Sequence, residues 1–277
     1  MAKIPQLKQE KKMKTIEELK NQIICGDCLE VMKGIPDKSV DMVLTSPPYD
    51  NLRDYKGYTF NFEGIAKELF RIVKDGGVVV WIVADETSNF CESLSSFKQA
   101  IYFNKIGFNL LDTMIYYKQN YAPAYPTLRR YANQFEYMFI FSKGKPKTFN
   151  PIQKEKVRMA SGMSSFSKKD GSKIVKYVDR NTRLTKDASN VWEYPSSSKN
   201  QNHPAVFPEK LAEDHILTWS NKGDIVLDPM CGSGTTLKMA KKNNRNYIGI
   251  DISEEYCKIS EARIKAYEEE NKQEKLL

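Results

Sequence analysis

The sequence lacks any long hydrophobic run. No window approaches the roughly 18 consecutive apolar residues that a membrane-spanning helix needs, so no membrane segment is expected. The charged N-terminal stretch MAKIPQLKQEKKMK is not followed by an apolar segment, which argues against a secretory signal. With 40% hydrophobic and 11% aromatic residues, the chain can still form a real core. We therefore expect a globular protein.

The sequence also lacks cysteine pairs and histidine clusters. Its five cysteines are odd in number and scattered, as expected of reduced thiols in a cytoplasmic protein. Cys25 and Cys28 form a C-x-x-C, but a zinc site would need two further ligands. The two histidines, His203 and His215, are far away and unsuitably spaced. We expect no metal site, and we expect the protein in the cytoplasm.

The glycine signatures of dinucleotide and ATP sites are incomplete. The apolar run DIVLDP, residues 224–229, leads into MCGSGTT and then a helical pattern from near Thr235. Gly232 and Gly234 permit a tight turn and a close approach of the backbone to a ligand at a helix N-terminus. Leu237 stands where a dinucleotide fingerprint has its third glycine, and the Gly-Lys-Ser/Thr of a P-loop is missing.

An acid ends the next apolar run, NYIGIDI, residues 246–252. Asp251 is well placed there to accept hydrogen bonds from a ribose diol. The stretch DISEE also resembles a helix start, in which Asp251 would be an N-terminal cap. In the first interpretation, the turn and the acid together predict an adenosine-bearing cofactor without a pyrophosphate.

Short apolar runs alternate with helical patterns along the 277 residues, which is the signal for parallel βαβ units. Seven strands with intervening helices predict an α/β fold with a doubly wound sheet. The expected strands are 22–27, 41–46, 77–84, 110–118, 135–143, 224–229 and 246–252. The expected helices are 61–73, 89–106, 208–219, 235–243 and 253–270.

Positive charge is concentrated in one segment. Between Lys145 and Lys199 lie thirteen Lys and Arg against five Asp and Glu, a surplus equal to the +8 of the whole chain. The regular pattern stops here, and so long an irregular segment within a compact domain usually has a function. We interpret it as an insertion that orders partly on a phosphate backbone. A solvated surface insertion is the alternative.

A stiff loop follows the second expected strand. The apolar run ends in Thr45-Ser46-Pro47-Pro48-Tyr49, and two prolines stop both strand pairing and helix formation. The Ser46 side chain and the Pro47 carbonyl are left available as hydrogen-bond acceptors. The loop and the Gly-rich turn both follow strand carboxyl ends, where doubly wound sheets bind ligands.

TSPPY, LDPMCGSGTT and NYIGIDIS together strongly resemble the motifs of amino-group DNA methyltransferases. These enzymes use S-adenosylmethionine to methylate N4 of cytosine or N6 of adenine. The motif order is similar to the circularly permuted β class, with Pro-Pro-Tyr first, a variable basic region next and the Gly-rich motif last. The resemblance extends from about Asn21 to Ile264 and departs at Met230, where the family usually has phenylalanine.

The resemblance implies a Rossmann-like methyltransferase sheet, mixed and seven-stranded, with an inserted target-recognition region. The implied parts are an N-terminal arm at 1–20, a catalytic half at 21–144, the basic target-recognition insertion at 145–200, a cofactor-binding half at 201–270 and a tail at 271–277.

The resemblance also implies cofactor contacts. The Gly-rich turn would surround the methionine part of S-adenosylmethionine, Asp251 would hold the ribose, and Gly26-Asp27 would contact the adenine. HPAVFPEKL, residues 203–211, resembles the element that closes over the methionine end. The predicted cofactor-binding residues are Asp27, Cys28, His203, Phe207, Asp228, Pro229, Cys231, Gly232, Gly234, Thr235, Thr236 and Asp251.

Three residues near the cofactor have structural alternatives. Phe207 and Glu209 could form a hydrophobic staple and a first-turn acid at a helix start. Cys231 could pack or shape the backbone of the loop. Covalent cytosine-C5 chemistry is not expected, because it needs a cysteine nucleophile, usually after a proline in that family, and no cysteine here follows one.

The predicted catalytic residues are Ser46, Pro47, Pro48 and Tyr49. An exocyclic amino group is a poor nucleophile because its lone pair is delocalised into the ring, and the Ser46 side chain and the Pro47 carbonyl could localise that pair by accepting both N–H bonds. The prolines preorganise the loop, and Tyr49 offers a face on which the base can stack. The base must leave the duplex to reach the pocket.

Ser-Pro-Pro-Tyr is more typical of N4-cytosine enzymes in this family, and Asp- or Asn-Pro-Pro-Tyr of N6-adenine enzymes. We therefore expect cytosine, with adenine as the alternative. Arginines can read guanine and lysines meet phosphates, so the basic residues near the loop and in the insertion are candidates for contacts with double-stranded DNA. The predicted DNA-binding residues are Arg53, Arg129, Arg130, Arg158, Lys168, Lys169, Arg180 and Arg183.

The sequence leaves open the partners of the enzyme and several alternative functions. It could belong to a restriction-modification system, with a cognate endonuclease acting on the same site, or it could be solitary. Many relatives pair as homodimers. A non-catalytic DNA-binding subunit is an alternative that the intact motifs disfavour, and a small-molecule methyltransferase is one that the basic segment disfavours. An RNA methyltransferase is a further alternative, which a binding preference for RNA would reveal.

Overall fold

The structure is a computed structural model, and it describes residues 15–48, 60–121, 129–155, 162–168, 170–178, 185–195 and 207–274. They form two compact units. One contains the residues up to Asn150 together with those from Asn190 onward, and the other is Pro151–Ser189. No helix within the described ranges is both long and apolar enough to cross a membrane.

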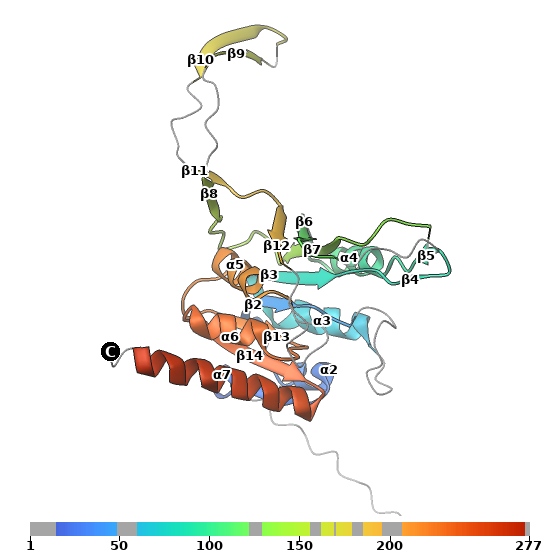
Figure 1. The fold of residues 1–277 in the computed structure, drawn as a ribbon, viewed down its shortest axis with the longest axis vertical. Helices are drawn as coiled ribbons and strands as arrows, with labels where there is room; N and C mark the ends of the chain where they lie inside the picture. The colour runs from blue at the N-terminus through green and yellow to red at the C-terminus, as the bar shows by residue number, and fades with distance from the viewer. Residues whose placement is uncertain are drawn as a thin grey trace, which may run out of the picture. The chain divides into compact units, whose positions relative to one another are not determined.

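The first unit is built on an eight-stranded sheet with the order β1-β14-β13-β2-β3-β7-β6-β12 (Figure 1). Neighbouring strands are parallel, except that β7 is antiparallel to β3 and β6. The sheet is therefore mixed, as predicted. Its strands are β1 (Gln22–Cys25), β2 (Val40–Thr45), β3 (Val73–Val83), β6 (Asn109–Lys118), β7 (Phe135–Ser142), β12 (Val191–Tyr194), β13 (Ile225–Asp228) and β14 (Asn246–Asp251).

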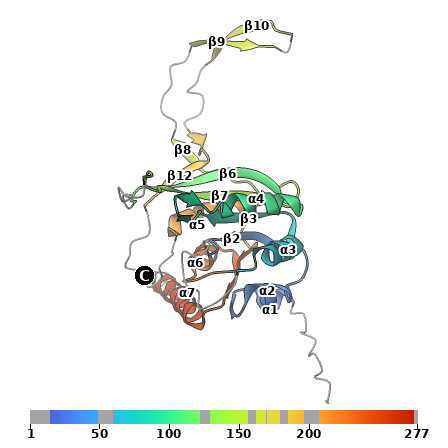
Figure 2. The same ribbon diagram turned by 90° about the vertical axis from the view of Figure 1, so that its right-hand side faces the viewer.

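Helices lie on both faces, so the sheet is doubly wound. Helices α5, α6 and α7 follow one another along one face, and α2, α3 and α4 along the other (Figure 2). The helices are α1 (Ile16–Leu19), α2 (Cys28–Met32), α3 (Phe62–Ile72), α4 (Ser95–Lys105), α5 (Glu209–Trp219), α6 (Thr235–Lys242) and α7 (Glu254–Glu274).

The core explains the near-continuous apolar runs of β2 and β3, since helices cover both of their faces. On the α3 and α4 side, Phe103 packs against Trp81 and Phe141, with ring centroids 5.1 and 4.6 Å apart. The buried indole nitrogen of Trp81 donates to Gln99 Oε1 at 2.8 Å, so its polar atom is satisfied. This packing holds α4 against β3 and β7.

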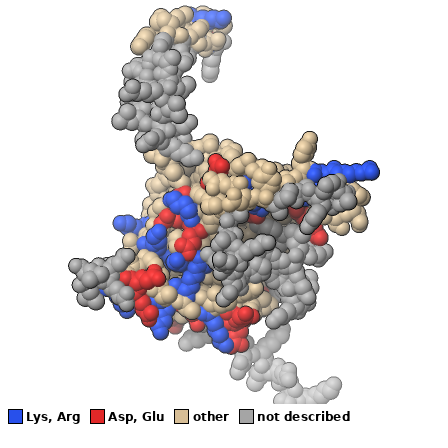
Figure 3. All heavy atoms as spheres, in the orientation of Figure 1, with Lys and Arg blue, Asp and Glu red and all other residues tan. Residues whose placement is uncertain are grey.

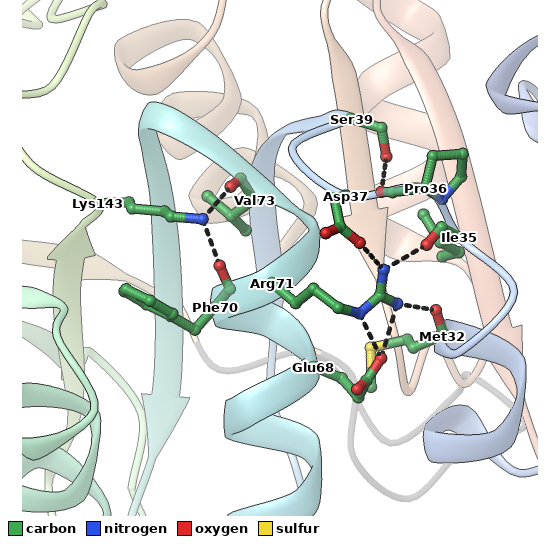
Figure 4. Close-up of polar contacts among 10 residues, drawn as sticks. All are labelled: Met32, Ile35, Pro36, Asp37, Ser39, Glu68, Phe70, Arg71, Val73 and Lys143. Carbon is green, nitrogen blue, oxygen red and sulfur yellow. Dashed lines mark hydrogen bonds and ion pairs between the residues drawn. The ribbon is translucent and has the colours of Figure 1, made fainter.

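Two basic side chains fasten helix ends at the amino edge of the sheet (Figure 4). Arg71 of α3 donates to the carbonyls of Met32 and Ile35, each at 2.8 Å. Lys143 donates to the carbonyl of Phe70 and lies 4.6 Å from the centre of its ring. Lys143 satisfies a carbonyl in the last turn of α3, and Arg71 ties the end of α2 and the loop after it to α3, so both have a structural role.

All seven predicted strands are present, but the predicted sheet was one strand short. The eighth, β12, is a short strand that pairs with β6 after the irregular segment. The helix predicted at 89–106 begins only at Ser95, because β4 (Thr87–Ser88) and β5 (Cys91–Glu92) form a small hairpin before it. The short helices α1 and α2 were not predicted.

The second unit falls inside the predicted insertion and consists of two antiparallel strand pairs. The sequence pattern indicated an irregular segment here, and each of these strands has only three to six residues. The pairs are β8 (Gln153–Glu155) with β11 (Thr185–Asp187), and β9 (Gly162–Ser167) with β10 (Lys173–Val178).

Candidate active site

The predicted motifs meet at one edge of the sheet. Strands β1, β14, β13 and β2 are parallel neighbours, so their carboxyl ends lie at the same edge. Asp27 follows β1, Asp251 ends β14, the Gly-rich turn follows β13, and Ser46-Pro47-Pro48 follows β2. Segments that are about 180 residues apart in sequence, such as Ser46 and the Gly-rich turn, therefore lie on adjacent strands.

The Gly-rich turn is tight and closely packed. Gly232 and Gly234 have φ of +50° and +77°, values that favour glycine. A Cβ on Gly234 would lie 2.5 Å from Ser260 Oγ of α7. The Gly234 N–H donates to the Cys231 carbonyl at 2.8 Å, and Gly234 itself begins α6. The backbone conformation of the turn therefore favours glycine at both positions, whether or not a ligand is bound.

Asp251 is half-buried and is held by backbone donors. Its Oδ2 accepts from the Gly232 N–H and its Oδ1 from the Ser253 N–H, each at 2.8 Å. Burial raises the pKa of Asp251, and the two N–H groups oppose that rise. The hydroxyl of Ser253 accepts from the Tyr256 N–H, so Ser253, not Asp251, caps α7. The carboxylate therefore joins the Gly-rich turn to the end of β14.

Asp228 is a second carboxyl at this edge, and it is only 2% exposed. Burial raises its pKa to about 6, while the Met230 N–H, which donates to Asp228 Oδ1 at 3.2 Å, and the polar side chains of Thr45 and Thr236 oppose the shift. The nearby Asp251 charge raises the pKa further. Asp228 ends β13 just before the Gly-rich turn, and its carboxyl group can change its protonation state near pH 6.

The Ser46-Pro47-Pro48 segment leaves the sheet directly after β2. Pro47 is buried, and Ser46 and Pro48 are half-buried. The buried hydroxyl of Thr236 in α6 donates to the Leu44 carbonyl of β2 at 3.3 Å. This bond joins the helix that follows the Gly-rich turn to the strand that carries the serine, so the two motifs are held together.

Sequence reasoning missed a guanidinium that fastens the turn. Arg263 of α7 donates to the carbonyl and hydroxyl of Ser233, each at 3.2 Å, and to Thr235 Oγ1 at 3.1 Å. It also lies 2.5 Å from Glu209 Oε1, and Lys238 lies 2.9 Å from the same oxygen. Burial opposes ionisation of Glu209, but the two cations hold its pKa below the usual value.

These ion pairs belong to a layer in which charges of both signs are interspersed over α5, α6 and α7 (Figure 3). A signal for Arg263 does exist in the sequence. Cys257, Ser260 and Ile264 recur at helical spacing and form the buried stripe of α7. Arg263 borders that stripe, so its guanidinium faces α6. The first-turn acid predicted at Glu209 is present, and its partners are these two cations.

Asp27 and the buried cysteines have structural contacts of their own. Asp27 caps α2, because its Oδ1 accepts from the Glu30 N–H at 3.0 Å. Cys28 is 5% exposed within the core, and Cys231 is 6% exposed below the turn. Across the described ranges, no three His, Cys, Asp or Glu side chains cluster as metal ligands.

The predicted DNA-binding residues fall in different places. Arg129 and Arg130 are exposed just before β7, and Lys168 is exposed in the β9–β10 turn of the second unit. Of the predicted cofactor-binding residues, Phe207 is half-buried just before α5. Seven predicted residues lie outside the described residues: Tyr49, Arg53, Arg158, Lys169, Arg180, Arg183 and His203.

The fold and the site define a class. A parallel strand, a Gly-rich turn and a helix, followed by an acid at the end of the next strand, form a Rossmann-like nucleoside site. In this chain that unit comes last in sequence, yet β13 lies between β14 and β2, as in a permuted arrangement. The protein is therefore a permuted Rossmann-like enzyme with a polar, proline-stiffened loop beside its nucleoside site.

Comparison with known proteins narrows the class to a family. The DNA methylase profile of the N6/N4 methyltransferases matches residues 40–262. The orphan methyltransferase M.BamHII of Bacillus amyloliquefaciens is 50% identical over 246 residues, covering 85% of this chain and 92% of the relative. The DNA adenine methyltransferase YhdJ of Escherichia coli K12 is 28% identical over 263 residues, covering 87% and 82%.

A solved structure is similar as well. TTHA0409 of Thermus thermophilus, complexed with S-adenosyl-L-methionine, is 25% identical with a TM-score of 0.58, covering 87% of this chain and 93% of that one. The chain belongs to the DNA methylase family, and it is an amino-group DNA methyltransferase.

Proposed function

We propose that this chain transfers the methyl group of S-adenosylmethionine to N4 of a cytosine turned out of duplex DNA. The observation that carries the proposal is the adjacency of Ser46-Pro47-Pro48 and the Gly-rich turn on neighbouring strands β2 and β13. Methyl transfer to an amino group needs donor and acceptor in line and no covalent enzyme intermediate. A site split between two adjacent strand ends would bring the methyl donor and the acceptor base next to each other.

Ser46 and the Pro47 carbonyl are the proposed acceptors for the two N–H bonds of the target amino group. Pro47 is buried and its φ is fixed by its ring, so its carbonyl has little freedom to turn away. Preorganised acceptors stabilise the positive charge that develops on nitrogen as the methyl group arrives. Pro48 keeps the loop rigid, and Tyr49 is the proposed stacking face for the base.

The Gly-rich edge is the proposed site of S-adenosylmethionine, and the ligand in TTHA0409 supports this assignment. Each Asp251 oxygen accepts one backbone bond and keeps a second lone pair for a ribose hydroxyl. The Asp228 carboxylate offers negative charge near a cofactor that carries a sulfonium and an ammonium. The other predicted cofactor-binding residues keep their proposed roles around these two acids.

N6 of adenine is the alternative acceptor. The name of YhdJ favours it, since that relative is called a DNA adenine methyltransferase. Both amino groups would be held by the same two acceptors, so the choice depends on the shape of the base pocket. Ser46, rather than Asp or Asn before Pro-Pro, is our reason for preferring cytosine.

The deciding experiment incubates the purified protein with genomic or plasmid DNA and S-adenosylmethionine and then analyses the digested nucleosides by mass spectrometry. N4-methyldeoxycytidine is the expected product. N6-methyldeoxyadenosine would overturn the base assignment and keep the mechanism. No methylated nucleoside, despite cofactor binding, would favour RNA as substrate or a non-catalytic subunit.

The same sample addresses the setting of the enzyme. The relative M.BamHII is named an orphan, which supports a solitary enzyme rather than one paired with an endonuclease. Sequencing the modified DNA would give the methylated site. Protection of that site against an endonuclease, together with such an activity in the source cells, would instead support a restriction-modification pair. Mass measurement of the pure protein would test a homodimer.

A further inference from the structure

The β4–β5 hairpin lies at the edge of the sheet that carries the active site. It leaves β3 four residues after Val83, and β3 is the parallel neighbour of β2. Figure 1 shows β4 and β5 beyond the arrowhead of β3, on the side where β14 also ends. The segment that leads into β7 reaches the same edge, because Tyr137 pairs with Val83.

The tip of this hairpin carries an exposed phenylalanine in an unfavourable conformation. Ser88 pairs with Cys91, which leaves a two-residue turn of Asn89 and Phe90 with φ of +49° and +61°. Such a turn prefers Asn followed by Gly, and a bulky residue in the second position is strained. Phe90 is nevertheless 79% exposed, so packing within the described structure does not account for it.

The base of the hairpin is rigid. The Asp85 carboxylate accepts from the Ser96 N–H at 2.8 Å, from the Ser96 hydroxyl and from the Ser93 hydroxyl at 3.1 Å. The Ser93 N–H donates to the Glu86 carbonyl at 2.9 Å. These bonds tie both ends of the hairpin to the start of α4, so Phe90 is presented on a fixed support.

Cationic and aromatic groups lie beside the hairpin. The Arg130 guanidinium donates to the Thr87 hydroxyl, which places its charge against β4. Arg129 is exposed, and Tyr131 is 97% exposed. Glu92, which pairs with Thr87 in the hairpin, is a negative charge on the same element. Arginines with exposed rings are the combination that binds phosphates and bases.

We propose that Phe90 inserts into duplex DNA beside the target base pair, and that Arg129 and Arg130 contact the flanking phosphates. Apolar side chains can wedge between base steps, and turning a base out of the stack costs unstacking and unpairing. A ring that fills the vacated space lowers that cost. The inference rests on the proposed methylation of duplex DNA and adds the surface that opens the duplex.

The test compares Phe90→Gly with the wild-type enzyme on three DNAs that contain the methylated site found by sequencing. These are a matched duplex, a duplex mismatched at the target base and the single strand. Glycine suits the left-handed conformation, so this variant should be at least as stable as the wild type. Ile101→Ala removes an exposed apolar side chain from α4 and is the matched control.

We expect Phe90→Gly to lower kcat/KM on the matched duplex by about tenfold or more relative to the wild type. On the mismatched duplex and the single strand its kcat/KM should approach the wild-type value, because the target base is already easier to turn out there. Fluorescence of 2-aminopurine at the target should fall in parallel, and Ile101→Ala should leave both unchanged. Wild-type kinetics on the matched duplex would overturn the proposal, and so would an equal loss on all three DNAs. The nucleoside analysis tests the proposed function separately: no methylated nucleoside would refute it before these DNAs are made, whereas methylated adenine would change the target base and leave this comparison as a test of Phe90.

Discussion

Removing the hydroxyl group of Ser46 tests the proposed chemistry most directly. Ser46→Ala deletes one of two acceptors, while the buried Pro47 and the half-buried Pro48 still hold the loop. Losing one preorganised acceptor is expected to lower kcat by about 100-fold or more. Binding of S-adenosylmethionine, measured by calorimetry, should remain unchanged because the Gly-rich turn is untouched. Wild-type turnover would remove Ser46 from the mechanism.

Asp228 predicts a pH dependence of cofactor binding. Its pKa of about 6 is raised by burial, so the neutral form accumulates below that pH. Affinity for the cationic cofactor should therefore fall as the pH drops through about 6. Asp228→Asn should bind weakly and without this dependence. Calorimetry from pH 5 to 8 measures both, and a flat wild-type profile would contradict the role.

The same raised pKa has the opposite effect on the unliganded fold. A carboxyl whose folded pKa exceeds its unfolded value binds protons better when folded, so its contribution to stability grows as the pH falls from 6 towards 4 and is lost above 6. At pH 8 Asp228→Asn should therefore raise the free energy of unfolding, by about 2–3 kcal/mol from a shift of roughly two pKa units. Urea denaturation without cofactor checks the sign. A destabilised variant would mean that the loop needs the charge.

At the scale of elements, Arg263 joins α7, the Gly-rich turn and the first turn of α5 in one network. Arg263→Gln removes an ion pair and several charge-assisted bonds, each worth about 1.5–3 kcal/mol. We expect KM for S-adenosylmethionine to rise about tenfold with a smaller change in kcat, because the turn loses its support. Arg263→Lys, which keeps a cation near Glu209, should recover part of the loss.

Arg71→Gln is a matched control for that experiment. Arg71 is also a half-buried arginine that donates to backbone carbonyls, but it does so at the amino edge of the sheet. Its loss should lower stability and leave KM unchanged. If both variants raise KM equally, Arg263 supports the fold in general and has no specific role at the turn.

The elements also explain what sequence patterns could predict. Strands such as β2 and β3 are found because burial on both faces makes them continuous apolar runs. The β4–β5 hairpin was missed, since its strands have two residues each and its turn holds Phe90 where glycine is usual. Arg263 was missed because its partners are 28 to 54 residues away, and only the fold brings them together.

The candidate site was predictable for a related reason. Strand carboxyl ends in a parallel sheet share an edge, so motifs recognised separately along the chain could be placed together from topology alone. The hydrogen bonds that the site residues make within the protein could not be predicted from the sequence. Asp27 caps α2, and Asp251 binds the Gly232 N–H through a contact that spans 19 residues.

For the whole molecule, the relevant feature is the second unit, in which most of the described side chains are exposed. Three large side chains of the β9–β10 hairpin are exposed, namely Met163 at 68%, Val175 at 57% and Tyr177 at 66%. An isolated hairpin is marginally stable in water. A partner that supplies both charge and surface would order it, and the basic surplus between Lys145 and Lys199 makes DNA the proposed partner.

Lys168 and Lys173 flank the turn of that hairpin and are both exposed, so they test this idea. If each contacts a phosphate, changing both to Ala should reduce the slope of log Kd against log salt by about 1–2, since each neutralised phosphate contributes about 0.9. Lys105→Ala with Lys222→Ala removes the same charge from the amino edge of the sheet and is the control. Equal effects from both pairs would show that only net charge matters, whereas a reduced slope for the hairpin pair alone would assign the phosphate contacts to the second unit.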